Sequence, residues 1–246
     1  MVRTKLMAAN WKMNKTVGEA LSYIKEFRGL VKDVKDKEML ICPPFTALFA
    51  LSAEIKTSNI GLGAQNMYFE DKGAFTSEVS AEMLKEIGCS YVIIGHSERR
   101  HIFNETDDMI NKKVKQALKN EIIPILCVGE KIEQREAGDT EKIVEGQLKE
   151  GLKGVEGDIV IAYEPVWAIG TGKTATSEQA EEVHVFIRGL LEKIFDKKIA
   201  AETRILYGGS VKPENAKELM SMENIDGALV GGASLDAKKF FDIINY

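Results

Sequence analysis

Short apolar runs alternate with amphipathic segments eight times along this chain, and that alternation constrains the fold more than any other feature. Such an alternation predicts an α/β fold, a parallel (β/α)8 barrel in which each strand is followed by a connection that returns the chain. No proline- or glycine-rich linker divides the sequence, so residues 1–246 are expected to form a single catalytic domain. The expected strands are Leu6–Ala9, Met39–Cys42, Ile60–Ala64, Tyr91–Ile94, Ile122–Val128, Ile159–Tyr163, Arg204–Tyr207 and Gly227–Val230.

Helical periodicity between these runs predicts helices at Val17–Val31, Ala47–Ile55, Ala81–Ile87, Ile110–Leu118, Thr140–Leu152 and from Glu178 onward. The last of these has the clearest apolar stripe, flanked by His184, and Thr176 and Gln179 are spaced as a capping box at its start. An open doubly wound sheet is the alternative architecture. It would carry a glycine fingerprint after its first strand, where this chain has Asn10-Trp11-Lys12.

Charge and cysteine content exclude several classes of partner. The net charge is -5, and the basic residues form no stripe, which argues against nucleic acid. No apolar run approaches the roughly 20 residues of a membrane span, and the first residues contain no signal-peptide core. Three cysteines in no CxxC spacing fit reduced thiols and argue against zinc. We therefore expect a cytoplasmic protein that binds neither membranes nor nucleic acid.

All strands of a parallel barrel point the same way, so the residues that follow them gather on one rim. Glycines after the last two strands allow backbone N–H groups to approach an anion closely, and phosphate is the ligand group we expect there. A lysine and a histidine on the same rim would supply a cation and a hydrogen-bond donor. The expected rim residues are Asn10, Lys12, Gln65, His96, Glu98, Glu164, Ser210, Gly231 and Gly232.

A carboxylate, Glu164, ends the sixth expected strand and is followed at once by Pro165. Proline biases the preceding residue toward extended backbone, which would hold the carboxylate at the strand end. The small and flexible residues beyond predict a lid over the site. The lid would comprise Pro165, Val166, Trp167, Ala168, Ile169, Gly170, Thr171, Gly172, Lys173 and Thr174. The alternative is an ordinary connection with a solvated glutamate.

A carboxylate base, a neutral imidazole and an ammonium group suit removal of a proton next to a carbonyl, without a metal. Each residue also has a plainer explanation. Lys12 could be solvated, His96 could be a core histidine bonded to backbone, and Glu98 could pair with Lys12 or Arg99. Asn10 and Gln65 fit orienting roles. Two other functions stay open from these residues: a Schiff-base aldolase that uses Lys12, and a barrel that binds sugar phosphates without catalysis.

The segment Gln65–Ser77 is a long expected loop with apolar side chains at Met67, Tyr68, Phe69 and Phe75. Apolar residues on a loop of this length would be costly in water, so we expect them to contact another subunit. The alternative is that they fold back onto their own barrel.

Five motifs resemble the triosephosphate isomerase family, whose fold is the TIM barrel. They are Asn-Trp-Lys-Met-Asn (Asn10 to Asn14), Gly-His-Ser-Glu-Arg-Arg (Gly95 to Arg100), the segment Ala162 to Thr174, Tyr-Gly-Gly-Ser-Val (Tyr207 to Val211) and Leu-Val-Gly-Gly-Ala-Ser-Leu (Leu229 to Leu235). The resemblance spans the whole chain. It implies an isomerase of glycolysis and gluconeogenesis that interconverts dihydroxyacetone phosphate and D-glyceraldehyde 3-phosphate without a cofactor.

The same resemblance implies roles for individual residues. Glu164 would be the base that moves the proton, and His96 would be the electrophile that polarises the carbonyl. Lys12 would hold the negative charge of the substrate and the transition state, with Asn10 beside it. The implied phosphate-binding residues are Gly170, Ser210, Gly231 and Gly232. Apart from the resemblance, Glu98 on the rim and Cys127 near the end of the fifth strand are expected to be supporting residues, and the sequence gives Cys127 no role beyond packing.

The resemblance also implies a homodimer. Its interface loop would include Gln65, Phe75 and Thr76, and Thr76 would touch Asn10 and Lys12 of the partner subunit. Ala9 and Ser77 stand where many members have glycine, which affects loop detail and not chemistry.

Overall fold

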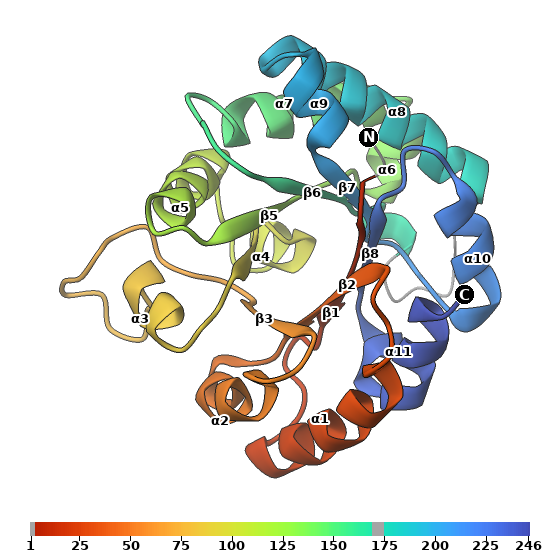
Figure 1. Ribbon diagram of the computed structural model, residues 1–246. Helices are drawn as coiled ribbons and strands as arrows, with labels where there is room; N and C mark the ends of the chain where they lie inside the picture. Colours follow the sequence, from red (N-terminus) through yellow and green to blue (C-terminus); the bar gives the residue numbers. More distant parts are fainter. Residues whose placement is uncertain (1–2, 169–174) are drawn as a thin grey trace.

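The strands close into a parallel barrel in the computed structural model, which describes residues 3–168 and 175–246 (Figure 1). Each strand pairs with the next along the chain, and β1 pairs with β8, so within the described ranges no sheet edge is left open. The strands are β1 (Lys5–Asn10), β2 (Lys37–Cys42), β3 (Ile60–Ala64), β4 (Tyr91–Ile94), β5 (Ile123–Val128), β6 (Val160–Tyr163), β7 (Arg204–Tyr207) and β8 (Gly227–Val230).

Helices surround the barrel on its outside (Figure 1). The long ones are α1 (Val17–Val31), α2 (Phe45–Ile55), α5 (Asp107–Lys119), α7 (Thr140–Gly151) and α8 (Ser177–Ile194). The shorter ones are α3 (Ala81–Glu86), α4 (Ser97–His101), α6 (Ile132–Glu136), α9 (Lys197–Glu202), α10 (Pro213–Ser221) and α11 (Ala237–Ile244), with 3-10 turns η1 (Val166–Ala168) and η2 (Gly232–Leu235). Among the described residues, none of these helices combines the length and the apolar character needed to cross a membrane.

The predicted barrel and all eight predicted strands are confirmed, with ends that move by one or two residues. The capping box at Thr176 is confirmed too, because its side chain accepts from the Gln179 N–H and the Gln179 side chain returns a bond to the Thr176 N–H. Sequence periodicity did not predict the helices α4, α6 and α9 to α11. Each is nine residues or shorter, too short to build a long apolar stripe.

Two apolar layers form the core, one inside the barrel and one between the strands and helices. Side chains alternate between them along each strand, so in β1 Leu6 and Ala8 face the interior. In β6 the interior-facing residues are Val160 and Ala162. Two residues further on, the same alternation brings Glu164 to the carboxyl end of the barrel interior, which positions a carboxylate over an apolar core.

A polar cluster closes the opposite end of the interior. Arg204 on β7 forms an ion pair with Glu38 on β2 and donates to the Tyr91 hydroxyl, 2.7 Å away, on β4. The Tyr91 hydroxyl in turn donates to Glu38 over 2.7 Å. Because each group in this triad has a partner, the barrel floor is closed without an uncompensated charge.

The loop from Gln65 to Ser77 corrects one prediction. Met67 is completely buried in the core of its own barrel, so it does not serve another subunit. Tyr68 stacks on Phe69 with ring centroids 4.2 Å apart and contacts Phe75 at 4.7 Å. Phe75 remains 40% exposed, so the prediction of a subunit contact stays open for this residue.

Ser77 has a backbone φ of 79°, the left-handed region in which a side chain is strained. We expect Ser77→Gly to raise the free energy of unfolding by about 1 kcal/mol, because relief of that strain exceeds the added freedom of the unfolded chain. Urea unfolding with an unchanged m-value measures this effect. Ser22→Gly, within helix α1, is the matched control and should lower stability. A Ser77→Gly protein less stable than the parent would contradict the prediction.

Candidate active site

A cavity of about 360 Å³ opens at the carboxyl end of the barrel. It brings together seven of the predicted rim residues: Asn10, Lys12, His96, Glu164, Ser210, Gly231 and Gly232. These residues come from five different strand ends, so the convergence depends on the closed barrel. Gly208 and Gly209, the glycines predicted after the seventh strand, line the cavity too. Sequence reasoning missed the other lining residues as site members, namely Trp11, Asn14, Val211, Lys212, Leu229, Ala233 and Leu235.

Glu164 is the buried carboxylate of this cavity, with only 2% of its surface exposed. One oxygen, Oε1, lies 2.9 Å from Nε2 of His96, and Oε2 accepts from the backbone N–H of Ser97 at 2.9 Å. Burial acts to raise the pKa of the Glu164 carboxyl. His96, the Ser97 N–H and Lys12 outweigh burial and hold the pKa below its usual range. The carboxylate is therefore ionised and held by two donors.

His96 joins the end of β4 to helix α4 and caps that helix with its own ring. Its Nδ1 accepts from the Glu98 backbone N–H at 3.2 Å, which requires Nδ1 to carry no proton. The proton then sits on Nε2 and points at Glu164. Burial lowers the pKa of His96, but the Glu164 carboxylate raises it above the usual value. From the hydrogen bonds we assign His96 as the neutral imidazole. In an imidazolium the Nδ1–H would point at the Glu98 backbone N–H, and two donors would face each other.

Lys12 supplies the positive charge of the site from a strained backbone, with φ at 53°. Its N–H donates to Asn10 Oδ1 at 3.1 Å, and its carbonyl accepts from Gln65 Nε2 at 2.9 Å. The Lys12 ammonium lies 2.7 Å from Glu98 Oε1. Asn10 and Gln65 thus make contacts that orient the Lys12 backbone, as expected from the sequence. Of the two ion pairs considered for Glu98, the structure has the one with Lys12.

The glycines at the ends of β7 and β8 leave room that side chains would fill. A Cβ on Gly208 would fall 2.8 Å from Cγ of Glu164, so this glycine lets the carboxylate approach β7. On Gly232 a Cβ would meet nothing within 4 Å, because this residue faces open space. Together with Ser210 and Gly231, the backbone at this end of the cavity is accessible to an anion.

Cys127 lies beneath the site, completely buried in the barrel interior. Burial and the neighbouring Glu164 carboxylate raise the pKa of its thiol well above the usual value, so the thiol stays neutral.

Only part of the predicted lid lies in the described ranges. Pro165 follows Glu164, and Val166 to Ala168 form the turn η1. Ile169, Gly170, Thr171, Gly172, Lys173 and Thr174 lie outside the described residues.

Glu130 is a buried carboxylate that the sequence prediction missed. It accepts from the Tyr163 hydroxyl at 3.1 Å and from the Trp167 indole N–H at 3.0 Å, and it pairs with Arg135 at 3.2 Å. A signal was available, because Glu130 is the second residue after the end of β5 and Glu164 is the first residue after the end of β6. This cluster joins the end of β5 to the first turn after Glu164.

Comparison with known proteins identifies the family. A sequence model described as triosephosphate isomerase matches residues 5–246. The chain belongs to the triosephosphate isomerase family. A relative named triosephosphate isomerase from Dictyoglomus turgidum is 55% identical over 99% of both chains, and one from Clostridium botulinum strain Okra is 55% identical over 100% of both. The crystal structure of triosephosphate isomerase from Bartonella henselae superposes with a TM-score of 0.91 at 41% identity, covering 98% of each chain.

These relatives confirm the family resemblance drawn from the five motifs, and the chain is an isomerase. They support the isomerase prediction over both alternatives, the Schiff-base aldolase and the binding barrel without catalysis. The roles of individual residues remain proposals, which the geometry of the cavity supports as argued below.

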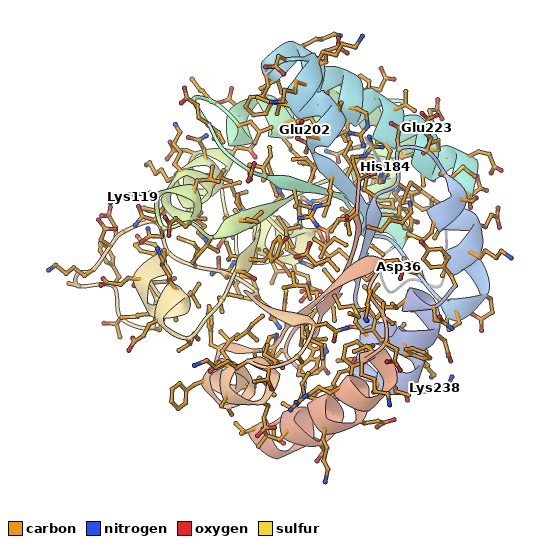
Figure 2. The ribbon with its side chains drawn as sticks, in the orientation of Figure 1. Asp36, Lys119, His184, Glu202, Glu223 and Lys238 are labelled. Carbon is orange, nitrogen blue, oxygen red and sulfur yellow. The ribbon has the colours of Figure 1, made fainter. Side chains whose placement is uncertain are left out.

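Of the three histidines of this isomerase, His101 and His184 do not line the cavity, and His184 is the buried one. His184 on α8 is completely buried on the barrel side of the helix. Lys119 and Lys238, in contrast, lie at the outer surface of the molecule (Figure 2). The Nδ1 of His184 lies 3.1 Å from the Asn224 carbonyl oxygen, and its Nε2 is buried without a partner among the described residues. Burial lowers the pKa of His184 to about 4, so the ring is neutral at pH 7.

We expect His184 to make the folded chain acid-sensitive. Its unfolded pKa is about 6.5, so between that value and pH 4 the unfolded chain binds the extra proton, and stability falls as pH falls. The full loss is about 3 kcal/mol. Urea unfolding at pH 7 and pH 4.5 measures it, and His184→Leu should have a shallower pH dependence over this window. Equal slopes for parent and variant would contradict the prediction.

Proposed function

We propose that this cavity interconverts dihydroxyacetone phosphate and D-glyceraldehyde 3-phosphate by moving a proton between C1 and C2. The observation that carries the proposal is the contact between a buried, ionised Glu164 and the Nε2–H of a neutral His96, with Lys12 lining the same cavity. Glycolysis and gluconeogenesis use this reaction, and the family membership of the chain supports the assignment.

In the proposed reaction Glu164 takes a proton from C1 of dihydroxyacetone phosphate. The electron pair moves to the carbonyl oxygen, which receives a hydrogen bond from His96 Nε2 and faces the charge of Lys12. His96 gives its Nε2 proton to the C2 oxygen and takes the proton of the C1 hydroxyl, so the negative charge of the enediolate moves to the C1 oxygen. The Glu164 carboxyl then protonates C2, which gives the aldehyde at C1 and restores the base. Asn10 holds the Lys12 backbone during these steps through its contact with the Lys12 N–H.

Glu164 must first exchange its partners. In the structure both oxygens of Glu164 accept hydrogen bonds, and its lowered pKa makes it a weak base. We propose that the carboxylate leaves the Ser97 N–H when substrate enters, and that it gains basicity when that donor is lost. Because Gly208 has no side chain, it places no Cβ against Cγ of Glu164 that would oppose this rotation.

For the phosphate we propose the backbone N–H groups of Ser210, Gly231 and Gly232, with Gly170 as the family resemblance implies. Measurement of isomerisation with D-glyceraldehyde 3-phosphate and with unphosphorylated D-glyceraldehyde tests this assignment. We expect kcat/KM to be at least about 10³-fold lower without the phosphate, because binding energy from the remote group is used at the reacting carbons. Equal values for the two substrates would contradict a phosphate subsite.

We further propose that the chain works as a homodimer and that residues 1–246 act as one catalytic domain. Exposed apolar side chains follow each of the first four strands: Met13, Phe49, Phe75, Ile102 and Phe103 are between 40% and 95% exposed. All of these except Phe49, which lies on helix α2, follow the carboxyl ends of β1, β3 and β4, and exposed apolar groups placed in this way suit a partner surface. Thr76, exposed on the same loop, would reach Asn10 and Lys12 of the partner subunit. Sedimentation equilibrium showing a monomer at micromolar concentration would contradict this proposal.

The cytoplasm is the compartment we propose for this isomerase. All three cysteines are buried and unpaired, which suits a reducing environment. Cell fractionation with an antibody against the chain tests this proposal, and recovery outside the cytoplasm would contradict it.

A further inference from the structure

Gln147 on helix α7 holds the backbone of Gly129 with both ends of its side-chain amide. Its Oε1 accepts from the Gly129 N–H at 2.8 Å, and its Nε2 donates to the Gly129 carbonyl at 3.1 Å. A side chain that satisfies both backbone groups of one residue imitates the pairing of a neighbouring strand.

Gly129 is the residue that packs against the backbone of Glu164. A Cβ at Gly129 would overlap the Glu164 carbonyl oxygen, so the two chains approach more closely here than a side chain would allow. On either side of this contact the ladder continues: the Glu164 N–H donates to the Val128 carbonyl at 2.8 Å, and the Val166 N–H donates to the Glu130 carbonyl at 3.1 Å. The segment 128–130 is thus the direct backbone support of Glu164.

On its other side, this segment pairs with no strand in the part of the chain that the structure describes. Strand β4 ends at Ile94, which is opposite Leu126, so β5 continues beyond its neighbour. The backbone groups that face this gap are bonded by side chains instead. Arg100 Nη2 donates to the Cys127 carbonyl at 3.1 Å, and Gln147 takes both groups of Gly129. Without these bonds the end of β5 would exchange its partners for water.

We propose that Gln147 is a positioning residue for the catalytic base: its amide stands in for the missing strand at Gly129 and thereby fixes the backbone of Glu164. The proposal rests on the proposed role of Glu164 as the base. Gln147 itself does not line the cavity and touches no reacting atom. Its loss should therefore lower kcat and leave KM almost unchanged, since the phosphate and Lys12 contacts are intact.

The variant Gln147→Glu tests this proposal through its pH profile. An ionised carboxylate accepts from the Gly129 N–H but repels the Gly129 carbonyl, whereas a protonated carboxyl again has one donor and one acceptor. Partial burial and the Gly129 carbonyl oxygen should raise the pKa of the new carboxyl above its usual value. The ratio of variant to parent kcat should be reduced about 10- to 100-fold at pH 8.5, as expected for a misplaced base, and should rise toward one as pH falls toward that pKa. Taking the ratio at each pH removes the pH dependence of the reaction itself.

Two further variants separate positioning from a general effect of the substitution. Gln134→Glu makes the same chemical change on helix α6, but the Gln134 side chain only accepts, from the Lys131 N–H at 2.8 Å. Its ratio should stay near one at every pH. Gln147→Met removes both bonds at similar volume, so it should lower kcat equally at all pH values, and it tests the proposal if the glutamate variant does not fold.

A pH-independent ratio for Gln147→Glu would overturn the proposal, as would a loss expressed in KM alone or full kcat in folded Gln147→Met. Glu164→Gln is measured alongside these variants. If Glu164→Gln kept full activity, the base assignment would fail, whatever the Gln147 variants did. If Glu164→Gln lost activity and the Gln147 variants did not, only the positioning role would fail.

Discussion

Replacing Glu164 with glutamine is expected to lower kcat by at least about 10³-fold, because the amide keeps the size of the side chain but accepts no proton from carbon. Removing the base leaves the glycine-lined end of the cavity and Lys12 in place. Binding of inorganic phosphate, followed by isothermal titration calorimetry, should therefore change by less than about threefold. A coupled assay of glyceraldehyde 3-phosphate isomerisation gives kcat.

Glu164→Asp is the matched variant, since it keeps the charge and withdraws the carboxylate by about one bond length. A displacement of that size costs roughly 10²-fold, so this variant should retain measurable activity between the parent and the glutamine variant. Full activity in Glu164→Gln would remove Glu164 from the reaction. Loss of phosphate binding with unchanged turnover would reverse the roles proposed here.

Replacing Lys12 with methionine is expected to lower kcat/KM by about 10²- to 10³-fold or more, because the cavity loses the charge that faces both the substrate and the developing oxyanion. Methionine keeps an unbranched chain of similar length. The ammonium is partly desolvated, with 26% of the side chain exposed, and Asn10 and Gln65 hold its backbone. Phosphate binding should weaken in the same variant, unlike in Glu164→Gln.

Lys212 provides the control for this prediction. It also lines the cavity, but it is exposed and precedes helix α10. Lys212→Met removes the same charge from the same cavity and should change kcat/KM by less than about threefold, as expected for a screened surface charge. Similar losses in the two variants would mean that the cavity needs only general positive charge, and the specific role of Lys12 would be wrong.

Much of the fold and the centre of the site follow from local sequence pattern. Each strand is an apolar run that ends in a marked change of composition, and a closed parallel barrel brings those ends together without further information. Glu164 illustrates this directly. Its place two residues beyond the interior-facing Ala162 is set by strand periodicity alone.

Long-range hydrogen bonding explains what the sequence did not predict. Helix α4 has five residues and owes its start to the ring of His96, which no propensity reports. The place of Glu130 after a strand marks it as a rim residue, but its partners lie on other elements and the neighbouring sequence does not indicate them. The same holds for the contacts of Gln147 with Gly129. Met67 was assigned to a partner surface because an apolar residue on a loop can be buried in two ways, and the local sequence does not separate them.

The central claim, that a base in this cavity moves a proton between two carbons, is tested most directly with dihydroxyacetone phosphate in deuterated water. Proton NMR of the products should show D-glyceraldehyde 3-phosphate that carries deuterium at C2, because the proton taken by Glu164 exchanges with solvent before it returns. The deuterated product should disappear with Glu164→Gln. Folded protein that binds phosphate but forms no aldehyde, or aldehyde without solvent deuterium at C2, would contradict the claim.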